Sequence, residues 1–281
     1  MTAVLVEDLR KSYSGHDALR GISFEIREGE VFSLLGPNGA GKTTTIEILE
    51  GYRRRDGGSV SVLGADPART TRAWRARIGV VLQSSAMYEN LTARESLALF
   101  GGYYERPRPV DEVIGVVGLE ENADRVVRKL SGGQRRRLDF GLALVGDPEL
   151  IFLDEPTTGF DPAARRTAWE TIRSLRELGK TILLTTHYLD EAEQLSDRVA
   201  VLRDGRIVAT GTPADLTRTP ATEIRYRENG RDVVLRTEQP TRALAELTSR
   251  AVERGEELTD LSVRRPSLEE VYLELTDRAA E

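Results

Sequence analysis

Eight consecutive residues have the types and spacing of a phosphate-binding loop. They follow the pattern G-x-x-x-x-G-K-T and are Gly36, Pro37, Asn38, Gly39, Ala40, Gly41, Lys42 and Thr43. Glycines let backbone N–H groups approach phosphate oxygens without a Cβ in the way, and the N-terminus of the next helix favours an anion. We expect Lys42 to reach the β and γ phosphates, and Thr43, with Thr44 beside it, to lie near Mg²⁺. The loop therefore predicts a nucleoside triphosphate site.

Two neighbouring carboxylates supply chemistry for such a site. Asp154 and Glu155 follow the apolar run at 150–153, so both should emerge at the carboxyl end of a buried strand, beside the phosphate loop. Asp154 is expected on the Mg²⁺ side, and Glu155 is expected to act as general base on an attacking water. Alone, an Asp-Glu pair after an apolar run indicates only the end of a strand; the phosphate loop favours the catalytic interpretation.

Composition excludes several other classes of function. The 281 residues are 39% hydrophobic and 31% charged, and no apolar stretch reaches the ~18 residues of a membrane-spanning helix. There is no cysteine, which excludes disulfides and thiolate chemistry and fits a cytoplasmic setting. The net charge of −6 gives no general attraction to nucleic acid, so we expect no nucleic-acid partner.

The elements around these residues predict an α/β domain over about 1–216. Short alternating strands are expected at 4–35, a helix at 44–50, and buried parallel strands at 150–153 and 181–184 with a helix at 163–178 between them. A helical subdomain at about 84–145 interrupts the sheet, and a hairpin at 199–210 closes it. The arginines at 53–55 and 135–137 are expected on solvated or ion-paired faces.

A small α+β domain is predicted over 222–281, after a linker at 217–221. Asn229-Gly230 favours a hairpin turn within 224–237. A helix is expected at 242–254 and a strand at 258–263. Ser267 and Glu270 have the spacing of a capping box, which predicts the start of a terminal helix.

The segment Leu130-Ser131-Gly132-Gly133-Gln134 resembles the signature of ATP-binding cassette (ABC) ATPases. The family's other motifs follow in its order: Tyr13 before the phosphate loop, Gln83 after an apolar run, Gly159-Phe160-Asp161-Pro162, and His187. The resemblance covers about 3–216. It implies that Tyr13 stacks on adenine, that Gln83 contacts the metal, that His187 contacts the γ-phosphate, and that Asp161 acts between subunits. Phe160 replaces the usual leucine.

The resemblance also implies a fold and an assembly. The fold is a P-loop ABC ATPase core, with a RecA-like parallel sheet, an antiparallel β subdomain and the inserted helical subdomain. Each ATP lies in a head-to-tail homodimer, between Lys42 of one subunit and residues 131–134 of the other, and ATP closes the dimer. Gln83 and the helical subdomain transmit this motion to a separate transmembrane permease, which places the ATPase on the inner face of the cell membrane.

Within the family, the sequence is most similar to ABC-2-type exporters, including the daunorubicin/doxorubicin resistance group. Three segments carry this similarity: 89–97, 185–193 and 266–276. The last implies assembly with the membrane subunit, although an amphipathic helix that packs on its own sheet is an equal alternative. Two other functions are weighed: a soluble ABC ATPase acting on nucleic acid or ribosomes, and a regulatory module that binds ATP without hydrolysing it. The cargo, its direction and the permease are not encoded in these motifs.

Overall fold

The computed structural model describes residues 1–83, 87–217, 222–228, 231–255 and 257–264. The chain divides into two compact units, Met1–Thr210 and Gly211–Glu281. The turn expected at Asn229-Gly230, the capping box at Ser267 and Glu270, and most of the linker lie outside the described residues. No helix among those described is both long and apolar enough to cross a lipid bilayer.

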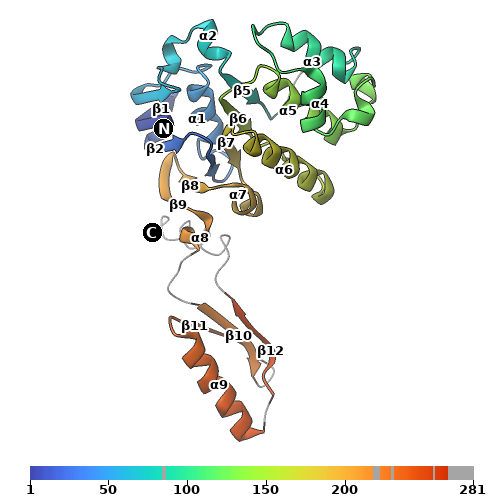
Figure 1. Ribbon diagram of the computed structural model, residues 1–281. Coiled ribbons are helices and arrows are strands. Elements are labelled where there is room, and N and C mark those ends of the chain that lie inside the picture. Colours follow the sequence, from blue (N-terminus) through green and yellow to red (C-terminus); the bar gives the residue numbers. More distant parts are fainter. Residues whose placement is uncertain (84–86, 218–221, 229–230, 256, 265–281) are drawn as a thin grey trace. The chain divides into compact units, whose positions relative to one another are not determined.

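A six-stranded sheet with the order β5-β6-β7-β3-β8-β9 organises the first unit (Figure 1). Its first five strands pair in parallel, as predicted for β6 and β7. The strand bounds are β3 Val31–Leu35, β5 Ile78–Val81, β6 Leu150–Asp154, β7 Thr181–Thr186, β8 Arg198–Arg203 and β9 Arg206–Gly211. Strands β3, β6 and β7 are buried along their whole length, because both faces of the sheet are covered.

Side chains that alternate along these strands form two separate cores. On one face, Ile151 and Leu153 of β6 pack with residues of the helical subdomain. On the other face, Leu150 and Phe152 pack with α1 (Lys42–Leu49) and the antiparallel sheet. The period of two along a strand separates the cores. The sheet therefore separates α1, which follows the phosphate-binding loop, from the helical subdomain, which contains the signature segment 130–134.

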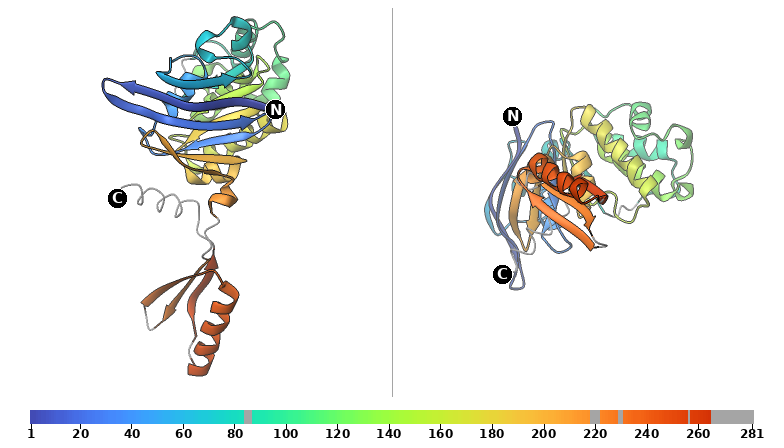
Figure 2. Two further views of the ribbon diagram at one scale, coloured as in Figure 1. Left: turned by 90° about the vertical axis from the view of Figure 1, so that its left-hand side faces the viewer. Right: turned by 90° about the horizontal axis from the view of Figure 1, so that it is seen from below.

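The antiparallel sheet has the order β2-β1-β4. Its strands are β1 Thr2–Tyr13, β2 His16–Arg27 and β4 Gly57–Val62. The first two are long strands of 12 residues each, rather than the short strands that the sequence suggested. Figure 2 shows them side by side in dark blue. Several register shifts along β1 explain why its apolar alternation is broken in the sequence.

Helices α3 to α5 form the predicted helical subdomain, and α6 and α7 complete the covering layer. Their bounds are α3 Ala93–Gly101, α4 Val110–Val116, α5 Gly132–Leu144, α6 Pro162–Glu177 and α7 Leu189–Leu195, with short 3-10 turns η2 Glu120–Asn122 and η3 Val127–Lys129. Between β4 and β5 lie a turn, η1 Pro67–Arg69, and a short helix, α2 Arg72–Arg75, that the sequence analysis did not predict. Thr71 caps α2, since its hydroxyl accepts from the Trp74 N–H.

The described residues of the second unit form an α+β fold of three strands, a short helix and a longer helix. It begins with α8 Pro213–Leu216, and its sheet has the order β11-β10-β12. The strands are β10 Thr222–Glu228, β11 Arg231–Thr237 and β12 Thr259–Arg264, and the helix is α9 Pro240–Arg254. Ile224 and Tyr226 of β10 pack against Leu247 of α9. The hairpin strands and the helix lie where the sequence predicts them.

Candidate functional site

The phosphate loop joins the end of β3 to the start of α1. Gly36 must be a glycine, because a Cβ there would lie 2.2 Å from the carbonyl oxygen of Leu202. Gly41 has φ +108°, in the left-handed region, and a Cβ on it would lie 2.7 Å from the Ala18 carbonyl oxygen. No side chain caps the first turn of α1. Its N–H groups therefore remain available to an anion, as predicted from the motif.

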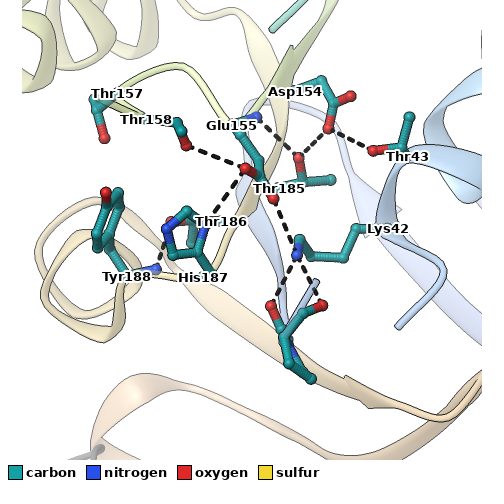
Figure 3. A network of polar contacts seen from close by, with 12 residues as sticks. Lys42, Thr43, Asp154, Glu155, Thr157, Thr158, Thr185, Thr186, His187 and Tyr188 are labelled. Carbon is teal, nitrogen blue, oxygen red and sulfur yellow. Dashed lines mark hydrogen bonds and ion pairs between the residues drawn. The ribbon is translucent and has the colours of Figure 1, made fainter. Parts of the chain in front are cut away.

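Lys42 is buried beneath the loop and points towards Glu155. Its Nζ donates to the carbonyl oxygens of Gly36, at 2.8 Å, and Pro37, at 3.1 Å. The same nitrogen lies 3.1 Å from Glu155 Oε1, and its side chain is only 4% exposed (Figure 3). The loop and the acidic strand end therefore meet through one ammonium group.

Asp154 lies at the end of β6, between Thr43 and Thr185. Its Oδ1 accepts from the Thr185 hydroxyl at 2.5 Å and from the Thr43 hydroxyl at 3.5 Å. Burial raises the pKa of Asp154, and the hydrogen bonds from Thr185 and Thr43 oppose this rise. The hydrogen bonds to this carboxylate thus come from neutral hydroxyl groups, which leaves it able to bind a cation.

Glu155 has φ +45°, a left-handed conformation that is strained for a residue with a side chain. Its N–H donates to the Thr185 hydroxyl at 3.0 Å, and its Oε2 accepts from the Thr158 hydroxyl at 3.1 Å. Burial raises its pKa, but the bond and charge of Lys42, followed by Thr158 and His187, bring the net pKa below the ordinary value. Glu155 is therefore an oriented carboxylate at neutral pH.

His187 follows β7 and faces the same carboxylate. Its Nδ1 lies 3.4 Å from Glu155 Oε2 (Figure 3). This nitrogen is buried and has no hydrogen bond within the described part of the chain. The structure thus brings Lys42, Glu155 and His187, the three predicted catalytic residues, to one point.

A cavity of about 630 Å³ opens at this point. It also includes Tyr13 from the end of β1 and Gln83 from beyond β5. Residues from five separate segments of the chain therefore converge on this cavity. The lining residues are Tyr13, His16, Ala18, Asn38, Gly39, Gly41, Lys42, Thr43, Thr44, Gln83, Glu155, Thr158 and His187.

The residues beside the cavity fit a magnesium ion that a nucleotide shares. Mg²⁺ prefers oxygen ligands and is usually bound by one or two protein groups together with phosphates and water. Thr43 and Asp154 place a hydroxyl and a carboxylate oxygen 3.5 Å apart, and Gln83 adds an amide. The described residues contain no cluster of three or more acidic, cysteine or histidine side chains that could hold a metal on their own.

The signature segment lies on a different cavity, of about 490 Å³. Ser131 caps α5: its hydroxyl accepts from Gln134 N at 3.2 Å, and Gln134 Oε1 accepts from Ser131 N at 2.9 Å. Gly132, Gly133 and Asp161 also line this cavity. Asp161 caps α6 by accepting from Ala163 N and Ala164 N. Within one chain, the signature and the phosphate loop therefore line separate cavities.

Buried polar residues support the site in ways the sequence analysis missed. Arg136 is 7% exposed, donates to the carbonyl oxygens of Leu82 and Pro156, and pairs with Asp139 at 3.5 Å. It thus joins the segment before Gln83 to the segment after Glu155. Its cluster was expected on a solvated or ion-paired face, and Arg136 is ion-paired but buried. Glu191 is fully buried and accepts from Thr157 and Trp169. From the sequence alone, the only sign that Arg136 is buried is that it interrupts the polar and apolar pattern of its helix.

Comparison with known proteins identifies the class of protein. The ABC transporter family model matches residues 19–158, and a model for the C-terminal domain of ABC transporter domain-containing proteins matches 209–267. The chain belongs to the ABC transporter family, as an ATP-binding subunit that hydrolyses ATP. The predicted family, enzyme class and fold class are confirmed.

Two relatives cover three quarters or more of the chain. Daunorubicin resistance ATP-binding protein DrrA3 of Streptomyces coeruleorubidus is 39% identical over 98% of this chain and 96% of its own. Nod factor export ATP-binding protein I of Paraburkholderia xenovorans is 44% identical over 76% of this chain and 72% of its own.

Solved structures of the family agree with the fold. The structure of an ATP-binding subunit of an ABC transporter has a TM-score of 0.72 at 26% identity, and the match covers 98% of this chain and 99% of that one. A dimeric post-hydrolysis ATP-binding cassette bound to ADP and phosphate has a TM-score of 0.66 at 26% identity, over 74% of this chain and 98% of that one.

Proposed function

We propose that this chain powers export through a separate transmembrane permease, with a drug, an antibiotic or another hydrophobic or polymeric cargo. The names of the most similar relatives, for drug resistance and for Nod factor export, support this direction. Residues 1–216 form the nucleotide-binding domain in this proposal, and 222–281 form an accessory domain. The ATPase binds an ABC-2-type permease on the inner face of the membrane. The net charge of −6 disfavours the alternative of a nucleic-acid-associated ATPase.

The observation that carries the proposed chemistry is the position of Glu155 between Lys42 and His187. The carboxylate, kept ionised by Lys42, accepts a proton from the water that attacks the γ-phosphate. Lys42 exchanges its contact with Glu155 for the phosphate, and His187 Nδ1, which has no hydrogen bond among the described residues, turns to the substrate. Thr43, Gln83 and Asp154 would hold Mg²⁺, which would supply positive charge beside the phosphates. A module that only stores ATP would not need this oriented carboxylate.

The separate positions of the two nucleotide-binding segments support a head-to-tail homodimer. Residues 131–134 line a cavity that does not include the phosphate loop. A second copy can bring its own α5 N-terminus over the nucleotide on Lys42, where the helix dipole favours the anion. Asp161 lies beside the signature in the same cavity, which agrees with a role between subunits.

Exposed aromatic side chains support a docking surface for the permease. Tyr52 is 77% exposed and lines a groove of about 720 Å³ together with Phe100. Tyr88 and Tyr103 lie 6.4 and 6.0 Å from Phe100, between ring centroids, and are 57% and 61% exposed. Such gathered apolar surface marks partner contacts. The groove also includes Leu82, whose neighbour Gln83 lines the nucleotide cavity. A partner bound in the groove would therefore be coupled to the nucleotide through Gln83.

The variant Glu155→Gln tests the catalytic proposal. It keeps the size of the side chain but removes the base, so ATP turnover should fall by about 10²–10⁴-fold while ATP binding persists. Glu170→Gln, an exposed position on α6, is the matched control and should keep normal turnover. Turnover that survives in Glu155→Gln would refute the base assignment.

A further inference from the structure

Two cations lie beside the Tyr13 ring, outside the nucleotide cavity. The Arg53 guanidinium carbon is 5.1 Å from the ring centroid, and Lys11 Nζ is 5.4 Å from it. Tyr13 lines the cavity, but neither cation does. Tyr13 therefore takes part both in the lining of the cavity and in the contacts with these two cations.

Each cation is anchored by a carboxylate. Arg53 Nε donates to Glu47 Oε2 at 2.5 Å, and the Arg53 N–H donates to the Glu47 carbonyl oxygen at 2.8 Å. Lys11 Nζ donates to Asp56 Oδ1 at 2.7 Å. Because Glu47 belongs to α1, the helix that begins at Lys42, Arg53 connects the ring to the phosphate-binding helix.

The hydroxyl of Tyr13 does not orient the ring. Its oxygen is buried and has no hydrogen bond within the described chain. A guanidinium over an aromatic face is attracted by the ring quadrupole. The cation contacts are therefore the polar interactions that hold this side chain.

We propose that Arg53, anchored by Glu47, is a positioning residue that holds the Tyr13 ring in the orientation in which it stacks on the nucleobase. This inference rests on the assignment of Tyr13 as the base platform. Arg53 acts through the ring and does not contact the phosphates. Its loss should therefore weaken ligands that carry a base and leave base-free polyphosphates unaffected.

Titration calorimetry with two ligands tests this split. The ligands are the magnesium complexes of AMP-PNP, a non-hydrolysable ATP analogue, and of inorganic tripolyphosphate. Arg53→Ala should raise the Kd for AMP-PNP about three- to tenfold, which equals about 0.6–1.4 kcal/mol, and leave tripolyphosphate unchanged. Arg53→Lys keeps the charge and should restore most of the affinity. Arg54→Ala, at the exposed neighbouring arginine, is the control and should match the unmodified chain.

Tyr13→Ala separates the two ways the inference can fail. If this variant binds AMP-PNP normally, Tyr13 does not stack on the nucleobase, and the proposed role of Arg53 is then also wrong. If Tyr13→Ala weakens the binding of AMP-PNP but Arg53→Ala behaves like Arg54→Ala, the stacking role of Tyr13 is supported and the positioning role of Arg53 is refuted. An equal loss for both ligands in Arg53→Ala would place its effect on the phosphate loop and also overturn the inference.

Discussion

Thr185→Val should destabilise the nucleotide-binding unit by removing one hydroxyl from beneath the acidic pair. The Thr185 hydroxyl is fully buried, donates to Asp154 Oδ1 at 2.5 Å and accepts from Glu155 N at 3.0 Å. Valine has nearly the same shape but cannot donate. The Glu155 N–H keeps a second acceptor, the Thr185 carbonyl oxygen at 3.2 Å. The substitution therefore acts mainly by removing the hydrogen bond that the Asp154 carboxylate accepts from Thr185.

The size of the effect follows from these contacts. A hydrogen bond to a charged group contributes about 1.5–3 kcal/mol, and the added methyl returns up to about 0.8 kcal/mol. We expect the free energy of unfolding to fall by about 1–2 kcal/mol. Thr45→Val is the matched control, because Thr45 is equally buried and its hydroxyl donates only to the neutral Gly41 carbonyl, which the Thr45 N–H also reaches. Its change should be close to zero.

Urea unfolding followed by tryptophan fluorescence measures this difference. Both tryptophans, Trp74 and Trp169, belong to the first unit, so the signal reports the unit that contains the site. With a slope of about 3 kcal/mol/M, the Thr185→Val midpoint should move down by about 0.3–0.7 M. Equal midpoints for Thr185→Val and Thr45→Val would show that the Asp154 contact does not stabilise the fold, and would refute the reasoning.

Three other predictions concern a helix cap, a buried acid and the metal. Asp161→Ala should lower the urea midpoint, because it removes the cap of α6 at a cost of about 1 kcal/mol. Asp161→Asn retains a capping oxygen and should leave the midpoint nearly unchanged. An equal decrease in both variants would show that the cap does not stabilise α6. Burial, then the charges of Glu47 and Asp154, raises the pKa of Glu50 from 4.5 to about 7, so stability should decline as pH rises from about 4.5 through 7, by up to about 3 kcal/mol. Unfolding at pH 5 and pH 8 should therefore differ less in Glu50→Gln than in the unmodified chain; an unchanged difference would exclude Glu50 as its source. Chelation of magnesium should abolish ATP turnover and added Mg²⁺ should restore it, and turnover that continues in excess chelator would argue against the Thr43 and Asp154 site.

The parts of the fold that the sequence predicts are those governed by local rules. The loop at 36–43 is predictable because a left-handed Gly41 and a crowded Gly36 allow few other residues. The buried strands β6 and β7 are predictable because both faces are covered, which gives unbroken apolar runs. The meeting of Lys42 with Glu155 follows from parallel strands that end at one edge.

The parts that the sequence does not predict depend on distant contacts. Arg136 is buried because two carbonyl oxygens from remote segments accept hydrogen bonds from its guanidinium, and its sequence neighbours do not identify these two partners. Glu155 keeps its left-handed φ of +45° while its N–H bonds to Thr185 of the neighbouring strand, a contact between residues thirty positions apart in the sequence. The length of β1 was missed because its register shifts disrupt the alternation that marks a strand.

We infer that two copies of the chain enclose ATP between Lys42 of one and Ser131 of the other. The most direct test is the mass of the Glu155→Gln chain in solution, measured by light scattering with magnesium and either ATP or ADP. The mass should double with ATP, remain that of one chain with ADP, and remain that of one chain with ATP when Ser131→Arg is added. A single-chain mass with saturating ATP, or a doubled mass that Ser131→Arg leaves intact, would contradict the account.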